Sequence, residues 1–408
     1  MKELYKIKDS LVLFDEQSSL TLWDPKEGWE LKLEAHMIDF LKAFAIPATK
    51  EAAYRSIATS YNVNEQFFED IVASFLSQKL IEPVSGAGKT NKPNLQIGMF
   101  RTPIISLKEC LMGEGTNIAF LGMPYDLNVT YRPGARFAPS YLRKVSGSVF
   151  QYDSDTLKGA YDPVKGKQIL QNIRMTDIGD ISSVVFSRNG TQFDSLEETI
   201  YRLTKKNILP TTIGGDHSIT LPCVKGAART YHKIGIIQLD AHSDFGLNQV
   251  EDWRETTHHG NFMDLLIEDE RVVDIVQIGI RQLVEGYLPH AKVKQYPGKS
   301  ILLLLSEMED RLNSEIPYYL TIDVDAMDPT VLSATGTPLP GGFTYEEMNE
   351  VLKTITKSAR IIGLDMVELL PGDSEVDGVL ASGLLINLLS NVMERLDEHC
   401  TSYSKSLT

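Results

Sequence analysis

Residues 234–245 read IGIIQLDAHSDF, an apolar run followed at once by two aspartates and a histidine. An apolar run of this length, closed by polar residues, is typical of a strand buried on both faces of a parallel sheet. Unpaired carboxylates at the end of such a strand would destabilise the fold by several kcal/mol or more. The sequence therefore predicts that a positive partner lies among these side chains.

The same alternation continues along the chain after residue 115. Short β-rich runs are separated by stretches of helical periodicity such as 196–206 and 345–358. This order predicts an α/β domain on a mainly parallel sheet, whose ligand sites lie at the carboxyl ends of the strands. The expected strands lie within 117–123, 171–181, 207–215, 233–242, 272–280, 318–326 and 359–369.

Three polar clusters follow these predicted strands, namely IGGDHS (213–218), DAHSD (240–244) and TIDVDAMDP (321–329). In an extended chain, alternate side chains point the same way, so each cluster can aim several groups into one pocket. Any one cluster alone is compatible with a helix cap or a turn, but three together favour a functional site. Many carboxylates with few histidines and no cysteine suit Mn²⁺ and related ions, and the number suits two ions. The expected ligands are His217, Asp240, His242, Asp244, Asp323 and Asp325.

Composition narrows the class of protein. The chain has 408 residues, a net charge of -15 and three cysteines, Cys110, Cys223 and Cys400. We therefore expect no nucleic-acid partner, no disulfide framework and reduced thiols in a cytoplasmic protein. The N-terminus has no signal-peptide core, and the longest purely aliphatic run near the C-terminal half, ILLLL at 301–305, is too short to span a membrane. We predict no membrane association.

The chain divides into two predicted domains. Residues 1–83 contain a predicted hairpin (11–14 and 20–23) and three helices, which is the outline of a small winged-helix-like domain. Its 9 Lys+Arg against 14 Asp+Glu give a net charge of -5, which argues against DNA binding. We place a linker at 84–110, richest in Gly, Ser, Asn and Pro at 84–94, and the catalytic domain at 111–400.

The motifs GGDHS, DAHSD and IDVDAMDP resemble the metal motifs of the ureohydrolases, the arginase and agmatinase family. LGMPYDLNVTYRPGARFAPSYLR (121–143), DIGDI, QIGIR, ATGTPLPGGFT and GLDMVELLP are similar to family segments in the same order. The resemblance covers about residues 115–395. It implies a three-layer α/β/α fold, a binuclear manganese centre (other divalent ions such as Ni²⁺ or Co²⁺ remain alternatives) and a homo-oligomer. It assigns one ion to His217, Asp240, Asp244 and Asp323, and the other to Asp240, His242, Asp323 and Asp325.

The resemblance also implies the chemistry, which is hydrolysis of a guanidino group to an amine and urea. It places His259 of HHGNF as the proton shuttle, with His258 as the adjacent competitor, and Glu368 as the guanidinium-binding carboxylate. Asp244 is counted with His259 and Glu368 among the catalytic positions. Imidazole suits proton transfer near neutral pH, and a carboxylate accepts two parallel bonds from a planar guanidinium.

The sequence departs from arginases where those enzymes hold the α-carboxylate and α-amino group of free arginine. Here these segments read FGLNQVEDWRETT (245–257) and GIRQLVEGY (279–287). The N-terminal domain resembles the PqqD-like peptide-recognition domains of ribosomal-peptide modifying enzymes. We therefore predict conversion of arginine to ornithine within a ribosomally made precursor peptide, whose leader the first domain binds. The alternatives are a hydrolase of a free small guanidino compound and an inactive scaffold that acts as a binding protein.

Overall fold

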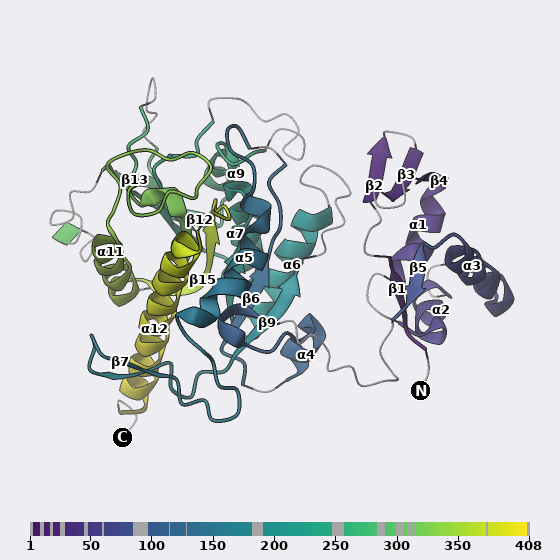
Figure 1. Ribbon diagram of the computed structural model, residues 1–408, viewed down its shortest axis with the longest axis horizontal. Helices are drawn as coiled ribbons and strands as arrows, with labels where there is room; N and C mark the ends of the chain where they lie inside the picture. The colour runs from purple at the N-terminus through teal and green to yellow at the C-terminus, as the bar shows by residue number, and fades with distance from the viewer. Residues whose placement is uncertain are drawn as a thin grey trace. The chain divides into compact units, whose positions relative to one another are not determined.

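The computed structural model describes two compact units, residues 1–95 with 184–192 and residues 96–183 with 193–408 (Figure 1). Each unit is described by itself. The described residues are 3–405 apart from 9–11, 17–18, 25–28, 45–47, 59–60, 85–96, 114, 128, 182–190, 247–256, 284–289, 299–305, 308–311, 313–314 and 373.

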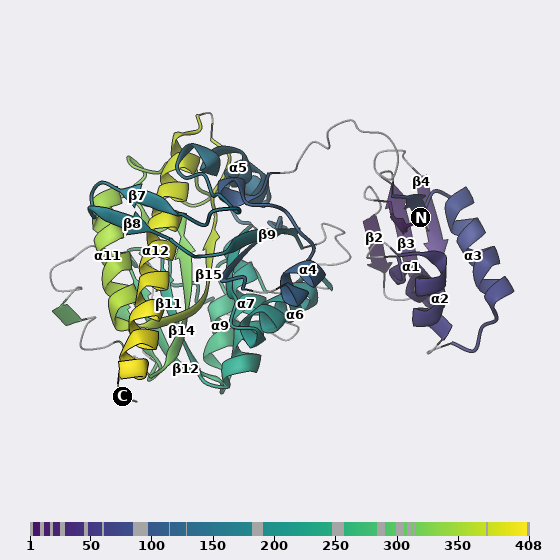
Figure 2. The same cartoon turned by 90° about the horizontal axis from the view of Figure 1, so that it is seen from below.

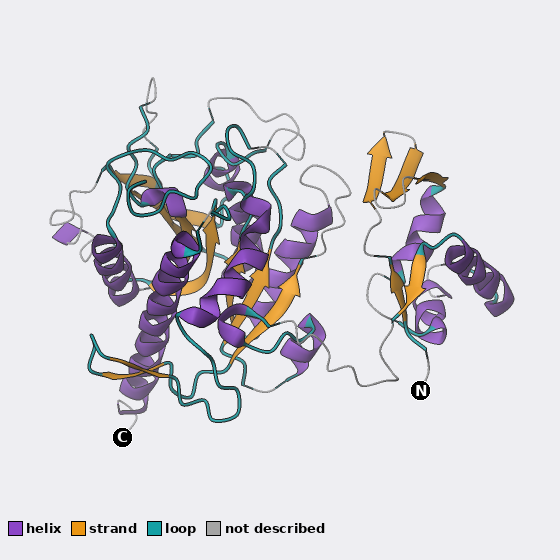
Figure 3. Cartoon of the chain, in the orientation of Figure 1, coloured by secondary structure: helices purple, strands orange, loops and turns teal. Residues whose placement is uncertain are grey.

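The larger unit is built on one eight-stranded sheet whose neighbouring strands are all parallel (Figure 3). The seven strands expected from the sequence are all present, and β13 is an additional edge strand. The order across the sheet is β13 (Val293–Tyr296), β12 (Val272–Ile278), β11 (Ile234–Leu239), β14 (Pro317–Asp323), β15 (Arg360–Val367), β10 (Leu209–Ile213), β6 (Ile118–Gly122) and β9 (Met175–Asp180).

Helices cover both faces of this sheet, so the predicted three-layer α/β/α architecture is confirmed (Figure 2). One face packs α5 (Ala138–Val145), α11 (Tyr345–Ser358) and α12 (Val376–Lys405) into a common core. The other face packs α6 (Thr191–Lys205), α7 (Thr220–Tyr231) and α9 (Phe262–Ile267). Shorter elements complete the unit, namely α4 (Leu107–Met112) and the β7 (Ala160–Asp162)–β8 (Lys167–Ile169) hairpin.

Helix α12 is unusually apolar over most of its length. Within the described residues it is the one helix long and apolar enough to cross a membrane, over Val376–Leu396. Because 72% of that segment is buried inside the protein, α12 is a core helix packed on the sheet, and this burial accounts for its apolar composition.

Strand β11 fits in the interior of the sheet because all its side chains except that of Gln238 are apolar and one position is glycine. All six residues of β11 are buried. A Cβ at Gly235 would collide with the ring of Tyr318 on the neighbouring strand β14, so glycine makes room for that ring. The Tyr318 hydroxyl in turn donates to Asp274 Oδ2 on β12 at 2.7 Å. Packing of this kind holds the strand ends, and hence the site, in register.

The smaller unit contains two antiparallel sheets and three helices. Its strands are β1 (Tyr5–Ile7) paired with β5 (Ile81–Pro83), and β2 (Val12–Glu16), β3 (Ser19–Asp24) and β4 (Trp29–Leu33) in that order. Its helices are α1 (Ala35–Lys42), α2 (Lys50–Ala58) and α3 (Glu65–Ser77). The hairpin and the three helices agree with the sequence, whereas β1, β4 and β5 were not predicted. Asn64 is the N-cap of α3, and its side chain accepts from Phe67 N–H at 2.8 Å.

The predicted linker is too long at its C-terminal end. Residues 97–110 belong to the larger unit, where Met99 and Phe100 are buried in the core. Ser106 begins α4 with a capping box, and Cys110 of that helix is buried. The apolar side chains of this segment explain the difference, since they join the core although the preceding stretch is rich in Gly, Ser and Asn. Residues 85–96 lie outside the described part of the chain.

Candidate active site

Four adjacent strands in the centre of the sheet deliver the predicted site residues. Strands β11, β14, β15 and β10 are neighbours, and polar residues follow their carboxyl ends. Asp240 follows β11, Asp323 ends β14, Glu368 follows β15, and His217 lies four residues after β10. All four are buried. Because parallel strands end at one edge, residues up to 151 positions apart in sequence meet here, as in the bond from His217 N–H to Glu368.

The backbone that brings the aspartates together is bent, in contrast to the extended chain expected from the sequence. Strand β11 ends at Leu239, the chain turns through 241–242, and Asp244 has a left-handed φ of 51°. Likewise Asp325 lies in a short 3-10 turn, Val324–Ala326, and its backbone N–H donates to the Asp323 side chain at 2.8 Å. The side chains converge as predicted, but turns rather than strand alternation aim them.

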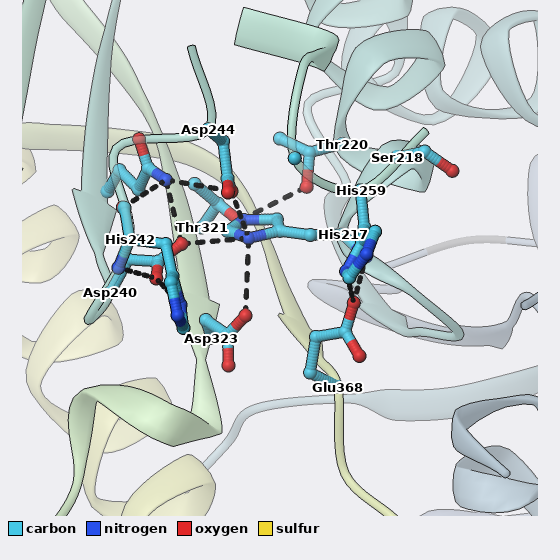
Figure 4. Close-up of polar contacts among 12 residues, drawn as sticks. His217, Ser218, Thr220, Asp240, His242, Asp244, His259, Thr321, Asp323 and Glu368 are labelled. Carbon is cyan, nitrogen blue, oxygen red and sulfur yellow. Dashed lines mark hydrogen bonds and ion pairs between the residues drawn. The ribbon is translucent and has the colours of Figure 1, made fainter. Parts of the chain in front are cut away.

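Five of the six predicted metal-ligand residues form two overlapping clusters, and the sixth, Asp323, contacts a residue of each. His217, Asp240 and Asp244 make one, and Asp240, His242 and Asp325 the other, with potential ligand atoms in each within 4.8 Å of one another. His217 Nδ1 lies 3.0 Å from Asp240 Oδ2, 2.8 Å from Asp244 Oδ2 and 3.4 Å from Asp323 Oδ2 (Figure 4). His242 Nδ1 lies 2.9 Å from Asp325 Oδ2 and 3.5 Å from Asp240 Oδ1.

The tautomer of His217 follows from its hydrogen-bond network. Its Nε2 lies 2.8 Å from the hydroxyl oxygen of Thr321, and that hydroxyl donates to Asp365 Oδ1 at 2.6 Å. The Thr321 oxygen therefore accepts, so Nε2 carries the hydrogen and Nδ1 is left to act as a ligand. Nδ1 is buried and makes no hydrogen bond of acceptable geometry, although three carboxylate oxygens surround it. A divalent cation bound between Nδ1 and these oxygens would relieve the repulsion between its lone pair and the carboxylates.

The electrostatics of the carboxylates give the same result. Burial, and next the charge of Asp240, raise the pKa of Asp244 to about 7. Burial, and next repulsion between neighbouring carboxylates, raise the pKa of both Asp323 and Asp325. Burial acts against protonation of His217, but the carboxylates of Asp244 and Asp240 outweigh it and raise its pKa well above the ordinary value. Without a metal ion, the site must hold protons to balance its negative charge.

The donor set fits two divalent cations. Oxygen donors outnumber imidazole nitrogens, no cysteine is among the donors, and Asp240 is shared between the clusters. Asp323 contacts one residue of each cluster. Its Oδ2 lies 3.4 Å from His217 Nδ1, and its Oδ1 accepts from the backbone N–H of Asp325 at 2.8 Å. The predicted assignment of two bridging aspartates, Asp240 and Asp323, is consistent with these contacts.

His259 and Glu368 meet beside the clusters. His259 Nδ1 lies 3.2 Å from Glu368 Oε1, which also accepts from the backbone N–H of His217 at 2.9 Å (Figure 4). The backbone N–H of Thr130 donates to His259 Nε2 at 3.2 Å, and the Thr130 hydroxyl is 3.0 Å away. Since an N–H must donate, Nε2 accepts and Nδ1 carries the hydrogen toward Glu368. No individual sequence feature pointed to Thr130, which lies within the family-like segment 121–143.

Glu368 is held in an uncommon backbone conformation. Its φ is 63°, in the left-handed region that non-glycine residues rarely adopt, and its N–H donates to Gly215 O at 2.9 Å. Its second carboxylate oxygen, Oε2, faces Gly336, where an added Cβ would lie only 3.1 Å from it. Burial acts against protonation of His259, but Glu368 raises the pKa of that imidazole above its ordinary value.

Three polar residues from the same motifs do not join the clusters. Asp216 caps a short turn by accepting from Ser218 N–H at 3.0 Å. Asp328 holds a surface turn, accepting from the Thr330 and Gly341 N–H groups at 3.0 and 2.7 Å. His258 Nδ1 accepts from Gly260 N–H at 3.1 Å, as expected of the weaker competitor to His259. Most of the two divergent segments, at 247–256 and from 284 onward, lies outside the described residues.

Comparison with known proteins identifies the family. The model of the arginase family matches residues 116–390, most of the larger unit. The chain belongs to the arginase family. The similarity extends to agmatinase of Gallus gallus (29% identical, 68% of this chain, 81% of that protein) and proclavaminate amidinohydrolase of Streptomyces clavuligerus (30%, 63% and 82%). A guanidinobutyrase of Pseudomonas aeruginosa is 29% identical over 63% of this chain and 80% of its own.

Solved structures of the family share the fold. The proclavaminate amidino hydrolase structure from Streptomyces clavuligerus is 27% identical, with a TM-score of 0.59, covering 72% of this chain and 96% of that one. Arginase from Bacillus subtilis gives a TM-score of 0.54 at 24% identity, covering 67% and 98%, which is a likeness of fold. Members of this family are hydrolases of C–N bonds in linear amidines, and this chain is such a guanidino hydrolase.

Proposed function

We propose that the protein is a binuclear manganese hydrolase that converts a guanidino group to an amine and urea. The observation that supports this most strongly is the pair of clusters sharing Asp240 beside the Glu368–His259 pair. His217, Asp240, Asp244 and Asp323 would hold one ion, and Asp240, His242, Asp323 and Asp325 the other. When bound, two divalent ions lower the pKa of water and supply a nucleophile near neutral pH.

The protein's own residues bind the substrate and move the proton. The carboxylate of Glu368 accepts N–H bonds from the planar guanidinium and so fixes the central carbon beside the clusters. When protonated, His259 gives its Nε2 proton to the leaving amine and returns to the neutral tautomer, whose Nε2 accepts from Thr130 N–H and whose Nδ1–H faces Glu368. Burial of Glu368 and His259 excludes bulk water and strengthens these contacts.

We further propose that the guanidino group is an arginine side chain within a ribosomally made precursor peptide, which becomes ornithine. The family match begins at residue 116, so residues 1–95 of the first compact unit lie outside it. Over a quarter of this chain likewise has no counterpart in the proclavaminate amidino hydrolase structure. The segments that would hold the α-carboxylate and α-amino group of free arginine differ from arginases, which agrees with a substrate whose backbone groups are in peptide bonds.

The first unit offers an edge for such a peptide. In the described sheet β2-β3-β4, strand β2 pairs with β3 on one side. An extended leader segment adding to β2 would gain backbone hydrogen bonds, with side-chain pockets supplying selectivity. Tethering the leader then raises the local concentration of the arginine-bearing core segment to about millimolar for a short flexible linker.

Mass spectrometry of a cognate precursor peptide tests this proposal on the full-length protein. Each modified arginine should lose CH₂N₂, because hydrolysis adds water and releases urea. A leader peptide without arginine, added in excess, should inhibit modification of the precursor and leave hydrolysis of a small guanidino compound unchanged. Deletion of residues 1–83 should likewise impair the first reaction more than the second.

The second candidate is hydrolysis of a free small guanidino compound. It is favoured by the names of the similar proteins, which include agmatinase and guanidinobutyrase. Efficient turnover of agmatine or 4-guanidinobutyrate, with the precursor peptide untouched, would establish this function in place of the peptide reaction. The manganese centre and the roles of Glu368 and His259 are common to both. Either enzyme would be a cytoplasmic homo-oligomer in our proposal.

A further inference from the structure

Three glutamines form a hydrogen-bonded ladder across neighbouring strands of the sheet. Gln238 on β11, Gln277 on β12 and Gln295 on β13 are register partners. The Gln295 amide nitrogen donates to Gln277 Oε1 at 2.6 Å, and the Gln277 amide nitrogen donates to Gln238 Oε1 at 2.6 Å. Gln238 and Gln277 are fully buried. Buried side-chain amides in a sheet normally have hydrogen-bond partners, and here each glutamine amide nitrogen donates to a neighbouring side chain.

The ladder ends on two of the metal-site carboxylates. The Gln238 amide nitrogen donates to Asp240 Oδ2 at 2.8 Å and to Asp244 Oδ2 at 3.1 Å. These are the two oxygens nearest to His217 Nδ1, at 3.0 and 2.8 Å. One amide group thus binds both carboxylates that face the His217 ligand nitrogen. Hydrogen bonds to a carboxylate are about twice as strong as those between neutral groups.

The orientation of this amide is fixed by the rest of the ladder. The Gln277 amide nitrogen also donates to the backbone oxygen of Ser243 at 2.7 Å, so its NH₂ group must point toward β11. A flipped Gln238 would present its oxygen to two carboxylates and its NH₂ group to that of Gln277. Both contacts would repel, and therefore only the observed orientation satisfies every group.

Gln238 contacts one of the two clusters far more than the other. Asp244 belongs to the His217 cluster alone, whereas Asp240 belongs to both. Asp325, in the second cluster, has supports of its own, namely Ala241 N–H at 3.0 Å and the Thr337 hydroxyl at 3.2 Å. The Gln238 amide nitrogen donates only a long hydrogen bond, 3.4 Å, to the backbone oxygen of His242.

We propose that Gln238 is a positioning residue that sets the affinity of the His217-side ion, with Gln277 fixing the orientation of its amide. The inference rests on the metal centre of the proposed function and holds for either substrate class. Partners that orient metal ligands typically contribute 10- to 100-fold to metal affinity. Removing the Gln238 amide frees Asp240 and Asp244 to move apart, since their charges repel when no ion is bound.

The test is calorimetric titration of Mn²⁺ into the full-length, chelator-treated protein. Gln238→Met keeps the length of the side chain and removes its polar groups. Ile236→Val is the matched control, because it lies two residues earlier on β11, is equally buried and touches neither carboxylate in the described contacts. We expect Gln238→Met to bind one of two Mn²⁺ about 10- to 100-fold more weakly. The other ion should change much less, and the control should bind both normally.

Several outcomes would overturn the inference. A folded Gln238→Met protein that binds both ions as tightly as the wild type, with only a lower apo melting temperature, makes the ladder purely structural. Equal weakening of both ions removes the assignment to the His217 side. If Gln238→Met does not fold, Gln277→Met decides, and unchanged Mn²⁺ affinity there refutes the proposal. Wild-type protein that binds fewer than two ions would instead refute the binuclear centre itself, and the inference with it.

Discussion

His259 Nδ1 lies 3.2 Å from Glu368 Oε1, so the residues that we propose as proton shuttle and guanidinium-binding carboxylate are paired before substrate arrives. The same Oε1 accepts from the His217 backbone N–H, which leaves Oε2 as the oxygen facing Gly336. A guanidinium that binds Glu368 must therefore compete with an imidazole for one oxygen and fit the space beside the other. Much of the expected behaviour of the enzyme follows from this pairing.

Glu368→Gln should reduce kcat/KM by about 10- to 100-fold, since a hydrogen bond to a charged group contributes about 1.5–3 kcal/mol. The substitution keeps the shape of the side chain and removes the charge that pairs with the guanidinium. Steady-state kinetics on a small guanidino compound provide the measurement, with the melting temperature confirming that the variant folds. Wild-type kinetics in this variant would show that Glu368 does not bind the substrate.

His259→Asn should lower kcat by about 10²- to 10⁴-fold with little change in Mn²⁺ content, because it removes proton transfer and leaves the clusters intact. His258→Asn is the matched control. Its Nδ1 accepts only a local bond from Gly260 N–H, which an asparagine oxygen can replace, so its kcat should stay near that of the wild type. If His258→Asn is the slower enzyme, the two histidines have been assigned the wrong way round.

The pH dependence of kcat, which reports the substrate complex, should differ from that of kcat/KM, which reports the free enzyme. Glu368 raises the pKa of His259 although burial opposes this, and guanidinium binding neutralises that carboxylate. A histidine that must be protonated to act loses activity as pH rises through its pKa. The alkaline limb of kcat, which reports the complex, should thus lie at lower pH than that of kcat/KM, which reports free enzyme. Identical limbs, or limbs that persist in His259→Asn, would contradict this.

The sequence predicted the central sheet and the convergence of the candidate metal-ligand residues because both depend on strong local patterns. Buried strands are apolar runs, and the motif after β11 carries three candidate ligands within five residues. The residues missed are those whose role depends on tertiary contact. Thr130 reaches His259 across 129 positions, and Gln238 is one polar residue within an apolar strand. The presence of Gln238 within the otherwise apolar run IGIIQL is the signal that could have indicated a special role.

Backbone conformation was the other property beyond the reach of the sequence. Asp244 and Glu368 both adopt left-handed φ values, 51° and 63°, without being glycine. Such conformations persist only where surrounding contacts enforce them, so no local pattern reveals them. The predicted C-terminal end of the linker was wrong for a related reason, because burial of Phe100 depends on the core of the larger unit.

Gly336→Ala should raise KM for guanidino substrates with little loss of stability. An added Cβ would lie 3.1 Å from Glu368 Oε2 and 3.4 Å from the Arg132 backbone oxygen, inside the space beside that carboxylate. Gly372→Ala is the control, since its Cβ would meet its neighbours at 3.4 Å or more. Kinetics and melting temperatures of both variants give the measurement, and an unchanged KM in Gly336→Ala would place the guanidinium elsewhere.

Removal of metal should make stability depend on pH in a defined direction. Burial, and next the charge of a neighbouring carboxylate, raise the pKa values of Asp244 and Asp216 to about 7, and burial raises that of Asp365 to about 6. In the unfolded chain these groups lose their protons near pH 4. Between about pH 4 and 7 the metal-free folded state therefore binds more protons than the unfolded state, so its stability falls as pH rises.

Mn²⁺ should reverse this loss, because the ions replace the protons that balance the buried carboxylates. The rise in melting temperature on adding Mn²⁺ should thus be larger at pH 8 than at pH 5.5, and close to two Mn²⁺ per chain should be bound at the higher pH. Asp240→Ala and Asp323→Ala should lose both the rise and the activity, because each aspartate serves both ions in our assignment. A metal-induced rise that is independent of pH, or one that survives in Asp240→Ala, would show that the stabilising ions bind outside these clusters.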